Sequence, residues 1–378
     1  MTGPFALLAV GKAAAAMAQG ALDAQRDGVD HGLVITKYGH LDDAPSHPRL
    51  RFLQAAHPIP DASSLHAGEA LLEFLHQLPD RIPLLALISG GASSLVDVLP
   101  PGGDAALLER LNRWLLGEPL DIRTVNRVRR AVSCIKGGRL ALHLAGRPCR
   151  LLLISDVPGD DPAVIGSGLL VAPLEPPAAP EELPDWLRPL AAAAPACPPA
   201  DAACFQTIDV HCVADNAQAR AAAAQAGQAL GLPVIVSDNL LQGESSHTGR
   251  WLAEQLRYAG PGLHVWGGET TVRLPPSPGR GGRAQALALA VARELEGGPP
   301  TWFLAAGTDG TDGPGEDAGA LVDHETCRRG RQAGLDPAES LQQADAGHFL
   351  EASGDLLRTG PTGTNVMDLM LALIPDRP

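Results

Sequence analysis

Lysine is almost missing from this chain. Of its 29 basic residues only Lys12, Lys37 and Lys136 are lysine, and the rest are arginine. The richness in alanine, glycine and proline indicates a codon bias toward arginine, so we interpret the remaining lysines as positions that resist replacement. Lys12 and Lys136 adjoin glycine, and a compact ammonium beside exposed backbone N–H groups suits a phosphate-facing turn, where a planar guanidinium has a different size and geometry. Phosphate chemistry is therefore the first hypothesis; the alternative is that the lysines stay by drift on solvated loops.

Other features are absent as well, and each absence excludes a class of protein. The six cysteines include no Cys-x-x-Cys pair and no cysteine–histidine cluster with zinc-ligand spacing. No apolar run reaches the roughly 18 residues that span a bilayer, and Met1–Val10 lacks the basic segment of a secretory signal. The net charge of -14 argues against a broad nucleic-acid or anionic-membrane surface, but it permits a local basic pocket for a small anion. We expect a soluble cytoplasmic protein with a small-molecule substrate and no nucleic-acid or membrane partner; a homo-oligomer stays open.

The first half of the chain alternates between strand-like and helix-like segments. Short apolar runs end in glycine-rich turns and then enter alanine-rich stretches, which is typical of an α/β fold with a mainly parallel sheet. The pattern predicts strands at 5–10, 33–36, 84–88 and 150–154 and a helix at 13–22. Because ligands bind outside the carboxyl ends of such strands, the polar turns that follow them are candidate site segments.

A proline-rich stretch precedes the second half. Nine prolines and long alanine runs lie between Pro173 and Pro199, a composition that predicts a surface excursion or hinge rather than core. We place a domain boundary near residue 205, which gives domains at 1–205 and 206–378 and suits a chain of 378 residues. A second α/β set follows, with predicted strands at 208–213, 234–236, 263–266 and 301–305 and predicted helices at 216–230 and 366–374.

Two glycine-rich turns in the first half can bind an anion. Gly11 and Lys12 join a predicted strand to a predicted helix, so free N–H groups, the positive helix end and an ammonium converge there. The turn lacks the Walker and Gly-x-Gly-x-x-Gly frames, and a plain strand-to-helix turn is the alternative. Ser89-Gly90-Gly91-Ala92-Ser93-Ser94 offers two glycines for close backbone approach and three hydroxyls for phosphate oxygens. Here the alternative is that Ser93 or Ser94 only caps the next helix.

The segment from Asn126 to Arg139 is rich in cations within an otherwise acidic chain. The basic side chains could lie on one face of a helix that ends at a glycine cap, where they would contact a substrate carboxylate or phosphate. Equally, most of the arginines could lie on a solvated face. Asn126 and Lys136 are our candidates for anion contacts.

An acidic loop follows the predicted strand at 301–305. Gly307–Asp317 holds four carboxylates in a segment built to turn sharply. Carboxylate oxygens coordinate hard cations, and Mg²⁺ usually needs one or two carboxylates besides substrate phosphate. The spacing excludes an EF-hand, and a solvated Asp-Gly turn is the alternative. Asp309, the first carboxylate after the strand, would reach furthest toward a ligand.

Arg283 follows Gly281-Gly282 at the start of a predicted helix. Arginine is electrostatically unfavourable there, which indicates an anion nearby. His57, which precedes Pro58, could act as a general base, although a loop histidine before proline is more often structural. Gly360–Asn365 repeats the glycine-rich theme near the end of the chain.

Taken in order, these segments resemble the glycerate 2-kinase family with a C-terminal MOFRL domain, some members of which are named hydroxypyruvate reductase. Each matching stretch is weak alone, but together they are specific and cover nearly the whole chain. They lie at 10–14, 36–40, 57–58, 89–93, 126, 136–138, 154–161, 267–270, 281–283, 307–313 and 360–365.

The resemblance implies a Rossmann-like N-terminal domain, an α/β MOFRL-type C-terminal domain and an active site in the cleft between them. It also implies Mg²⁺-dependent transfer of a phosphoryl group from ATP to the 2-hydroxyl of D-glycerate, which gives 2-phosphoglycerate and ADP. Lys12 and Arg283 would neutralise the transferring group, and Asp309 would hold Mg²⁺ or orient the hydroxyl. The expected metal ligands are Asp156 and Asp309. The expected nucleotide and phosphate contacts are Gly11, Ser89, Gly90, Gly91, Ser93, Ser94, Asn126 and Lys136.

The chain also departs from the family's pattern. Ala284 and Ala286 replace two polar residues beside Arg283, and Met367 stands where asparagine is common. Two alternatives therefore stay open. One is an NAD-dependent hydroxypyruvate reductase, against which the chain lacks a dinucleotide fingerprint. The other is a catalytically inactive glycerate- or nucleotide-binding protein, against which Lys12 and Arg283 are both present.

Overall fold

The computed structural model describes residues 3–41, 44–118 and 120–376. The chain divides into two compact units, Met1–Val213 and Ala214–Pro378. Each unit is built on a six-stranded sheet with helices packed against it, so the expected two-part α/β architecture is confirmed.

The first unit has a sheet with the strand order β3-β2-β1-β4-β5-β6. Its strands are β1 (Phe5–Val10), β2 (Val29–Lys37), β3 (Leu50–Ala55), β4 (Leu84–Ile88), β5 (Cys149–Ile154) and β6 (Ile208–Ala214). The pairs from β3 through β5 are all parallel, as predicted. The strand order reverses direction at β1 and β4, and such a reversal opens a crevice at the carboxyl ends of the strands.

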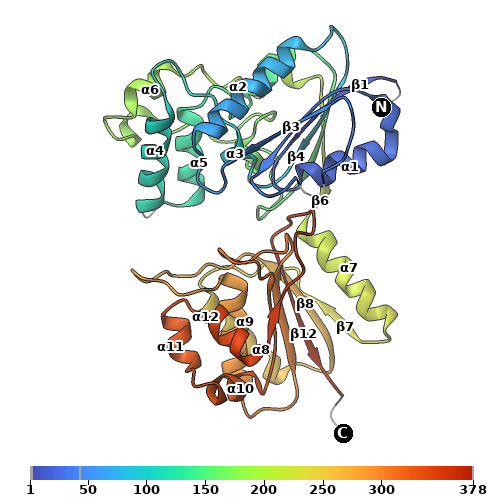
Figure 1. Ribbon diagram of the computed structural model, residues 1–378, viewed down its shortest axis with the longest axis vertical. Coiled ribbons are helices and arrows are strands. Elements are labelled where there is room, and N and C mark those ends of the chain that lie inside the picture. Colours follow the sequence, from blue (N-terminus) through green and yellow to red (C-terminus); the bar gives the residue numbers. More distant parts are fainter. Residues whose placement is uncertain (1–2, 42–43, 119, 377–378) are drawn as a thin grey trace. The chain divides into compact units, whose positions relative to one another are not determined.

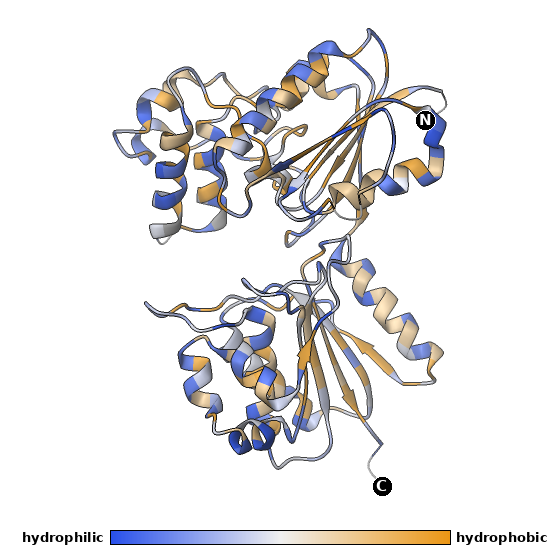
Figure 2. Ribbon diagram, in the orientation of Figure 1, coloured by the Kyte–Doolittle hydropathy of each residue, from blue (hydrophilic) through white to orange (hydrophobic). Residues whose placement is uncertain are grey.

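Helices cover both faces of this sheet (Figure 1). These are α1 (Ala14–Gln25) on one face and α2 (Ala62–Gln77) and α3 (Ala92–Leu95) on the other. The helices α4 (Ala105–Gly117), α5 (Ile122–Ala131) and α6 (Arg188–Ala193) pack with one another in a separate cluster. The side chains of β1 contact helices on both faces, because alternate side chains of a strand point to opposite faces of the sheet. Phe5, Leu7 and Ala9 pack with α1, whereas Leu8 and Val10 belong to the core that includes α2 and α3. The hydrophobic strands between more polar outer helix faces are visible in Figure 2.

The proline-rich stretch is not the surface excursion or hinge that its composition predicted. Leu183, Leu187 and Leu190 are buried and form a hydrophobic cluster with Leu111 of α4 and Val128 of α5. Prolines set the turns of this segment, but the leucines between them still supply enough apolar surface to build a satellite core.

The prediction that residues 208–213 open the second domain is also wrong. These residues form β6, which completes the first sheet beside β5. The backbone N–H of Cys149 donates to the carbonyl of Thr207 at 2.9 Å, and Arg150 pairs with Asp209 at 3.1 Å. Most β6 side chains are exposed, so the strand carries little apolar pattern that could have assigned it to either sheet.

The second unit has the strand order β11-β10-β9-β12-β8-β7. Its strands are β7 (Val234–Val236), β8 (Gly262–Gly268), β9 (Trp302–Gly307), β10 (Gly319–Asp323), β11 (Leu356–Leu357) and β12 (Asp368–Ile374). β7 and β8 run parallel, whereas the pairs from β8 through β11 are antiparallel. The sheet of this unit is therefore mixed, unlike the parallel arrangement from β3 through β5 in the first unit.

Helices of the second unit are distributed unequally over the sheet, with α7 on one face and α8 to α12 on the other (Figure 1). Their bounds are α7 (Asn216–Ala229), α8 (Ser245–Tyr258), α9 (Arg283–Leu295), α10 (Thr326–Gln332), α11 (Pro337–Gln342) and α12 (Ala346–Ser353). α9 lies in the middle of this layer, and ten of its thirteen residues are buried. Across the parts of the chain that the structure describes, no helix is long and apolar enough to cross a membrane.

The predicted helix at 366–374 is instead β12, between β8 and β9. Its burial alternates from residue to residue, with Met370, Ala372 and Ile374 in the core. Leucine, methionine and alanine favour helices intrinsically, but the pairing partners on both sides override that preference.

Candidate active site

The turn after β1 and the turn after β4 are locked together at the carboxyl edge of the first sheet. Gly11 has φ +136°, and a Cβ there would lie 2.1 Å from Ser89 Oγ. The N–H of Lys12 donates to the carbonyl of Gly90 at 2.9 Å, and the N–H of Ala13 donates to Ser89 Oγ at 3.0 Å. Only glycine fits at position 11, because it accepts this backbone conformation and leaves room for Ser89. The two predicted anion-binding turns thus form one structure at the point where the strand order reverses.

His57 and Lys12 approach the second of these turns. A Cβ on Gly91 would lie 2.9 Å from His57 Cδ2 and 3.2 Å from Lys12 Cγ. Gly91, at φ +83°, is itself the N-cap of α3, so Ser93 and Ser94 lie inside the helix and do not cap it. The capping alternative for these serines is therefore wrong. Glycine at 91 leaves space beside the stem of Lys12 and the imidazole of His57.

Ser93 belongs to a short chain of hydrogen bonds. Its hydroxyl lies 2.7 Å from the hydroxyl of Ser167, which donates to Asn126 Oδ1 at 3.3 Å. Ser167 follows β5 and Asn126 lies on α5, so three segments far apart in sequence meet here. Ser167 was missed from the sequence, although the flanking Gly166 and Gly168 are a signal that could have marked this turn.

A small cavity of about 120 Å³ lies beside Asn126. Arg130, one turn further along α5, lines it together with Asp161 and Glu175. Arg130 is 5% exposed, and its Nε is buried without a hydrogen-bond partner among the described residues. A buried donor left unpaired is costly, so this guanidinium is prepared for an acceptor from outside the chain.

Lys136 does not have the role that its glycine neighbours predicted. Its side chain is 2% exposed and its ammonium pairs with Asp97, which also accepts from Ser133 Oγ at 2.6 Å. Burial lowers the pKa of Lys136, and the neighbouring Asp97 charge opposes that shift. The ammonium is neutralised inside the fold, so the prediction of an anion contact is corrected to that of a structural ion pair.

Asp156 stands two residues after the end of β5 and is half-buried. β5 is the neighbour of β4, and the two strands are parallel. Asp156 therefore follows the same edge of the sheet as Ser89 and Gly90. Its position fits the predicted role at a metal, and that role stays a prediction.

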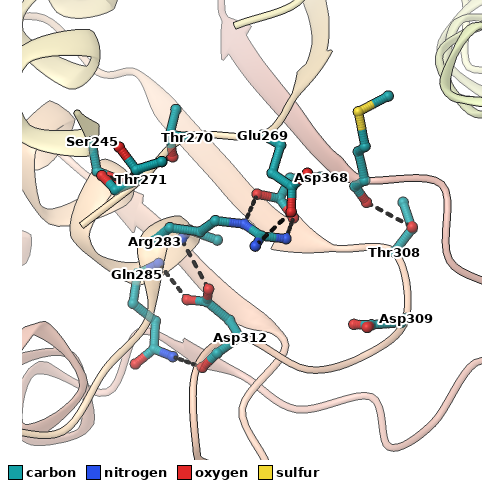
Figure 3. Close-up of polar contacts among 12 residues, drawn as sticks. Ser245, Glu269, Thr270, Thr271, Arg283, Gln285, Thr308, Asp309, Asp312 and Asp368 are labelled. Carbon is teal, nitrogen blue, oxygen red and sulfur yellow. Dashed lines mark hydrogen bonds and ion pairs between the residues drawn. The ribbon is translucent and has the colours of Figure 1, made fainter. Parts of the chain in front are cut away.

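In the second unit, Arg283 is held by two carboxylates (Figure 3). Its Nε and Nη2 donate to Oδ2 and Oδ1 of Asp368 at 2.7 and 2.9 Å, and its Nη1 lies 2.7 Å from Glu269 Oε1. Burial on its own lowers the pKa of Arg283, but the hydrogen bonds and charge of Asp368, with the charge of Glu269, raise it above its usual value. The guanidinium is thereby fixed in orientation as well as in charge.

Asp312 places a negative charge at the start of α9, where the positive charge of Arg283 would otherwise interact unfavourably with the positive end of the helix. Its carboxylate accepts from the backbone N–H groups of Ala284 at 3.1 Å and Gln285 at 2.8 Å (Figure 3). Burial raises the pKa of Asp312 to about 6, although these backbone donors lower it. The anion that the sequence indicated near Arg283 is thus supplied by the protein itself, from Asp312 and Asp368.

Asp309 lies in the same acidic loop and is half-buried. Its Oδ1 accepts from the N–H and hydroxyl of Thr311 at 3.0 and 2.9 Å, which fixes the carboxylate. The glycine-rich loop at 360–365 packs against it, because the carbonyl of Gly360 lies 2.0 Å from where a Cβ of Gly310 would be. These two loops, both singled out from the sequence, therefore lie side by side.

The donor set fits a magnesium ion bound with a nucleotide. Within the described ranges, no group of three or more histidine, cysteine, aspartate and glutamate side chains is arranged to hold a metal. Mg²⁺ commonly uses only one or two protein carboxylates and takes its other ligands from substrate phosphates and water. Asp309 or Asp156 meets that smaller requirement.

Comparisons with known proteins agree with this architecture. Residues 1–184 match the model of a domain of unknown function, DUF4147, and residues 262–368 match the MOFRL family. The chain is 33% identical to the D-glycerate 2-kinase of Thermotoga maritima over 97% of this chain and 90% of that one. It is 38% identical to an Agrobacterium vitis protein provisionally named hydroxypyruvate reductase, over 98% of this chain and 87% of that one.

A solved structure extends the likeness to three dimensions. The crystal structure of glycerate kinase from Thermotoga maritima superposes with a TM-score of 0.85 at 31% identity, over 98% of this chain and 92% of that one. Likeness of sequence and of structure thus spans both units. The chain belongs to the glycerate 2-kinase family with a C-terminal MOFRL domain.

Proposed function

We propose that this protein is a glycerate 2-kinase, which transfers the γ-phosphoryl group of ATP to the 2-hydroxyl of D-glycerate and releases 2-phosphoglycerate and ADP. The observation that carries the proposal is the locked pair of turns that presents Lys12 beside Gly90 and Gly91. A helix start and an ammonium at one place suit phosphate oxygens. The N–H groups of Gly11, Lys12 and Ala13 donate within the fold and are not part of this set. Relatives that are named for this reaction match nearly the full chain.

The reaction needs little covalent chemistry from the protein. An oxygen–phosphorus bond forms at the 2-hydroxyl, the bond from the γ-phosphorus to the bridging oxygen breaks, and the hydroxyl proton is lost. Catalysis therefore depends on positioning and on neutralising charge. Lys12 and Arg283 are the cations we assign to the transferring phosphoryl group, and Asp309 is the carboxylate we assign to orienting the hydroxyl or holding the metal.

Mg²⁺ is part of this proposal, with Asp156 and Asp309 as its protein ligands. When bound, the ion neutralises phosphate charge. The turn residues Gly11, Ser89, Gly90, Gly91, Ser93 and Ser94 are the proposed phosphate contacts.

The small cavity beside Asn126 is our proposed place for the substrate carboxylate. Arg130 supplies a buried guanidinium, and Arg123 supplies a second guanidinium that offsets the carboxylates of Asp161 and Glu175. Asn126 and Asp161 supply groups that hydrogen-bond hydroxyls. The volume of about 120 Å³ is far below the roughly 300–1,000 Å³ of sites for drug-sized ligands, as suits a three-carbon acid.

We further propose that Lys12 and Arg283 serve one active site, although they belong to different units. The order of strands in the first unit supports a Rossmann-like description of it. The shared site is tested with Lys12→Ala, Arg283→Ala and the double variant. Groups that act as one catalytic unit give a double variant about as slow as the slower single variant, whereas independent groups give additive losses.

The test of the proposed reaction is a paired assay of the purified full-length protein. One arm follows ADP release from D-glycerate and Mg-ATP, and the other follows NADH oxidation with hydroxypyruvate. The kinase predicts ADP release alone. NADH oxidation without ADP release would instead identify a reductase, and tight binding of glycerate without either product would identify an inactive binding protein.

We propose a cytoplasmic location, where ATP is available, and cell fractionation tests it.

A further inference from the structure

We propose that the helical face of the second unit carries an anion-binding site, distinct from the Arg283 cluster, for a small anion with two or more negative charges such as inorganic phosphate or a phosphate ester. The site is a cavity of about 520 Å³, within the range of small-molecule sites. Its walls come from the start of α8, the segment after β8, the second half of α9, and α11. The proposal does not depend on the reaction proposed above.

The cavity has a strong local excess of positive charge. Arg250, Arg273 and Arg293 line it, with His247 beside them, whereas Glu244 is the acidic residue of its wall. The carboxylate of Glu244 accepts from the backbone N–H of His247 at 3.0 Å and so serves the start of α8. Three guanidinium groups around one space repel each other, and a multivalent anion relieves that repulsion.

These arginines keep most of their donors available. Arg250 donates to the carbonyl of Ser246 at 3.3 Å, Arg293 reaches Glu294 only at 3.4 Å, and Arg273 has no ion pair or hydrogen bond within the described ranges. Neighbouring arginines of the same helical layer behave differently. Arg280 pairs with Glu351 at 2.7 Å and Arg329 with Asp355 at 2.6 Å.

The cavity is separated from Arg283 along the helix that both share. Ala290 and Arg293 follow Arg283 by seven and ten residues, which is about 10–15 Å along α9 at 1.5 Å per residue. The cavity therefore offers a second place for an anion on the same unit.

The test is equilibrium binding of inorganic phosphate to the full-length protein at low ionic strength, with the number of sites counted. Arg250→Gln removes one charge from α8 inside the cavity. Arg257→Gln, the matched control, removes one charge from the same helix outside it, where Arg257 Nη2 donates to the carbonyl of Glu294 at 3.0 Å and lies 3.6 Å from its carboxylate. We expect Arg250→Gln to weaken one class of sites at least tenfold, and Arg257→Gln to change it less than twofold.

Two further variants show whether any loss of phosphate binding comes from this cavity. Arg273→Gln lies outside any helix and should reproduce the loss if Arg250→Gln fails to fold. Lys12→Ala should leave this class of sites intact, which separates it from phosphate bound at the proposed active site. Equal binding by wild-type, Arg250→Gln and Arg273→Gln proteins would overturn the proposal. An equal loss in Arg257→Gln would also overturn it, because the binding would then be diffuse surface attraction.

Discussion

Replacing Asp368 by asparagine tests whether Arg283 must be held in place to function. The substitution keeps the size of the side chain but removes its charge and sets an amide N–H₂ against the guanidinium. Arg283 then loses at least one of its two bonds to residue 368, at 2.7 and 2.9 Å, and keeps Glu269 at 2.7 Å. Asp368 is 1% exposed, so water does not replace the lost interaction.

The expected loss of stability follows from these contacts. Hydrogen bonds to charged groups contribute about 1.5–3 kcal/mol each. Because the Arg283 side chain is 35% exposed and keeps Glu269, we expect the free energy of unfolding to fall by about 2 kcal/mol. For a unit of this size that lowers Tm by about 4–8 °C. A misoriented Arg283 also costs transition-state stabilisation, so kcat should fall about 10²-fold, as when one preorganised donor is removed.

The assay combines steady-state ADP release with thermal denaturation. Asp355→Asn is the matched control, because Asp355 is an aspartate of the same unit whose side chain is 9% exposed and pairs with Arg329 at 2.6 Å. It should lower Tm by a similar amount and leave kcat within about twofold of wild type, since its role is structural. If both variants lose stability but Asp368→Asn keeps the wild-type kcat, then Asp368 does not position Arg283 for catalysis.

Three further predictions concern single residues of each unit. Lys12→Ala should lower kcat by about 10³-fold while Tm changes little, since its ammonium is assigned to the phosphoryl group; near-wild-type turnover would remove Lys12 from the mechanism. Lys136→Ala should destabilise the first unit by about 3–5 kcal/mol, because it leaves Asp97 buried and uncompensated, yet the KM for ATP of the folded fraction should not change; a large rise in KM without loss of stability would restore the phosphate role. For Asp312, the folded-state pKa of about 6 lies above the ordinary 3.8, so the folded state holds the proton more tightly and stability falls as pH rises from about 4 to about 6, by up to about 3 kcal/mol. Asp312→Asn should remove that fall in urea unfolding, and an identical pH dependence in both proteins would contradict the shifted pKa.

Local sequence patterns predicted four of the six strands of the first sheet, whereas β3 was not predicted and β6 was assigned to the second domain. Phe5–Val10 and Leu84–Ile88 are strands at the predicted bounds, and the polar turns after them meet at the carboxyl edge. Parallel strands buried on both faces appear as continuous apolar runs, which are easy to recognise.

The features that the sequence did not predict depend on ion pairs and strand pairs between residues far apart in the chain. Nothing near Lys136 indicates that Asp97 neutralises it, and nothing near residues 366–374 shows that β8 and β9 flank them. Arg283 is the intermediate case: its unfavourable place at a helix start predicted an anion, but not that Asp312 and Asp368 supply it. The cavity arginine Arg130 was visible only as one cation among many.

A glycerate 2-kinase transfers the phosphoryl group of ATP to the 2-hydroxyl of D-glycerate, so the position of the phosphate in the product distinguishes this reaction from phosphorylation at the 3-hydroxyl. The purified protein is incubated with D-glycerate and Mg-ATP, and the products are identified by ³¹P NMR. We expect 2-phosphoglycerate and ADP in equal amounts, with both formed about 10³-fold more slowly by Lys12→Ala. Formation of 3-phosphoglycerate alone, or no ADP at all from a folded and saturated enzyme, would contradict the proposed reaction.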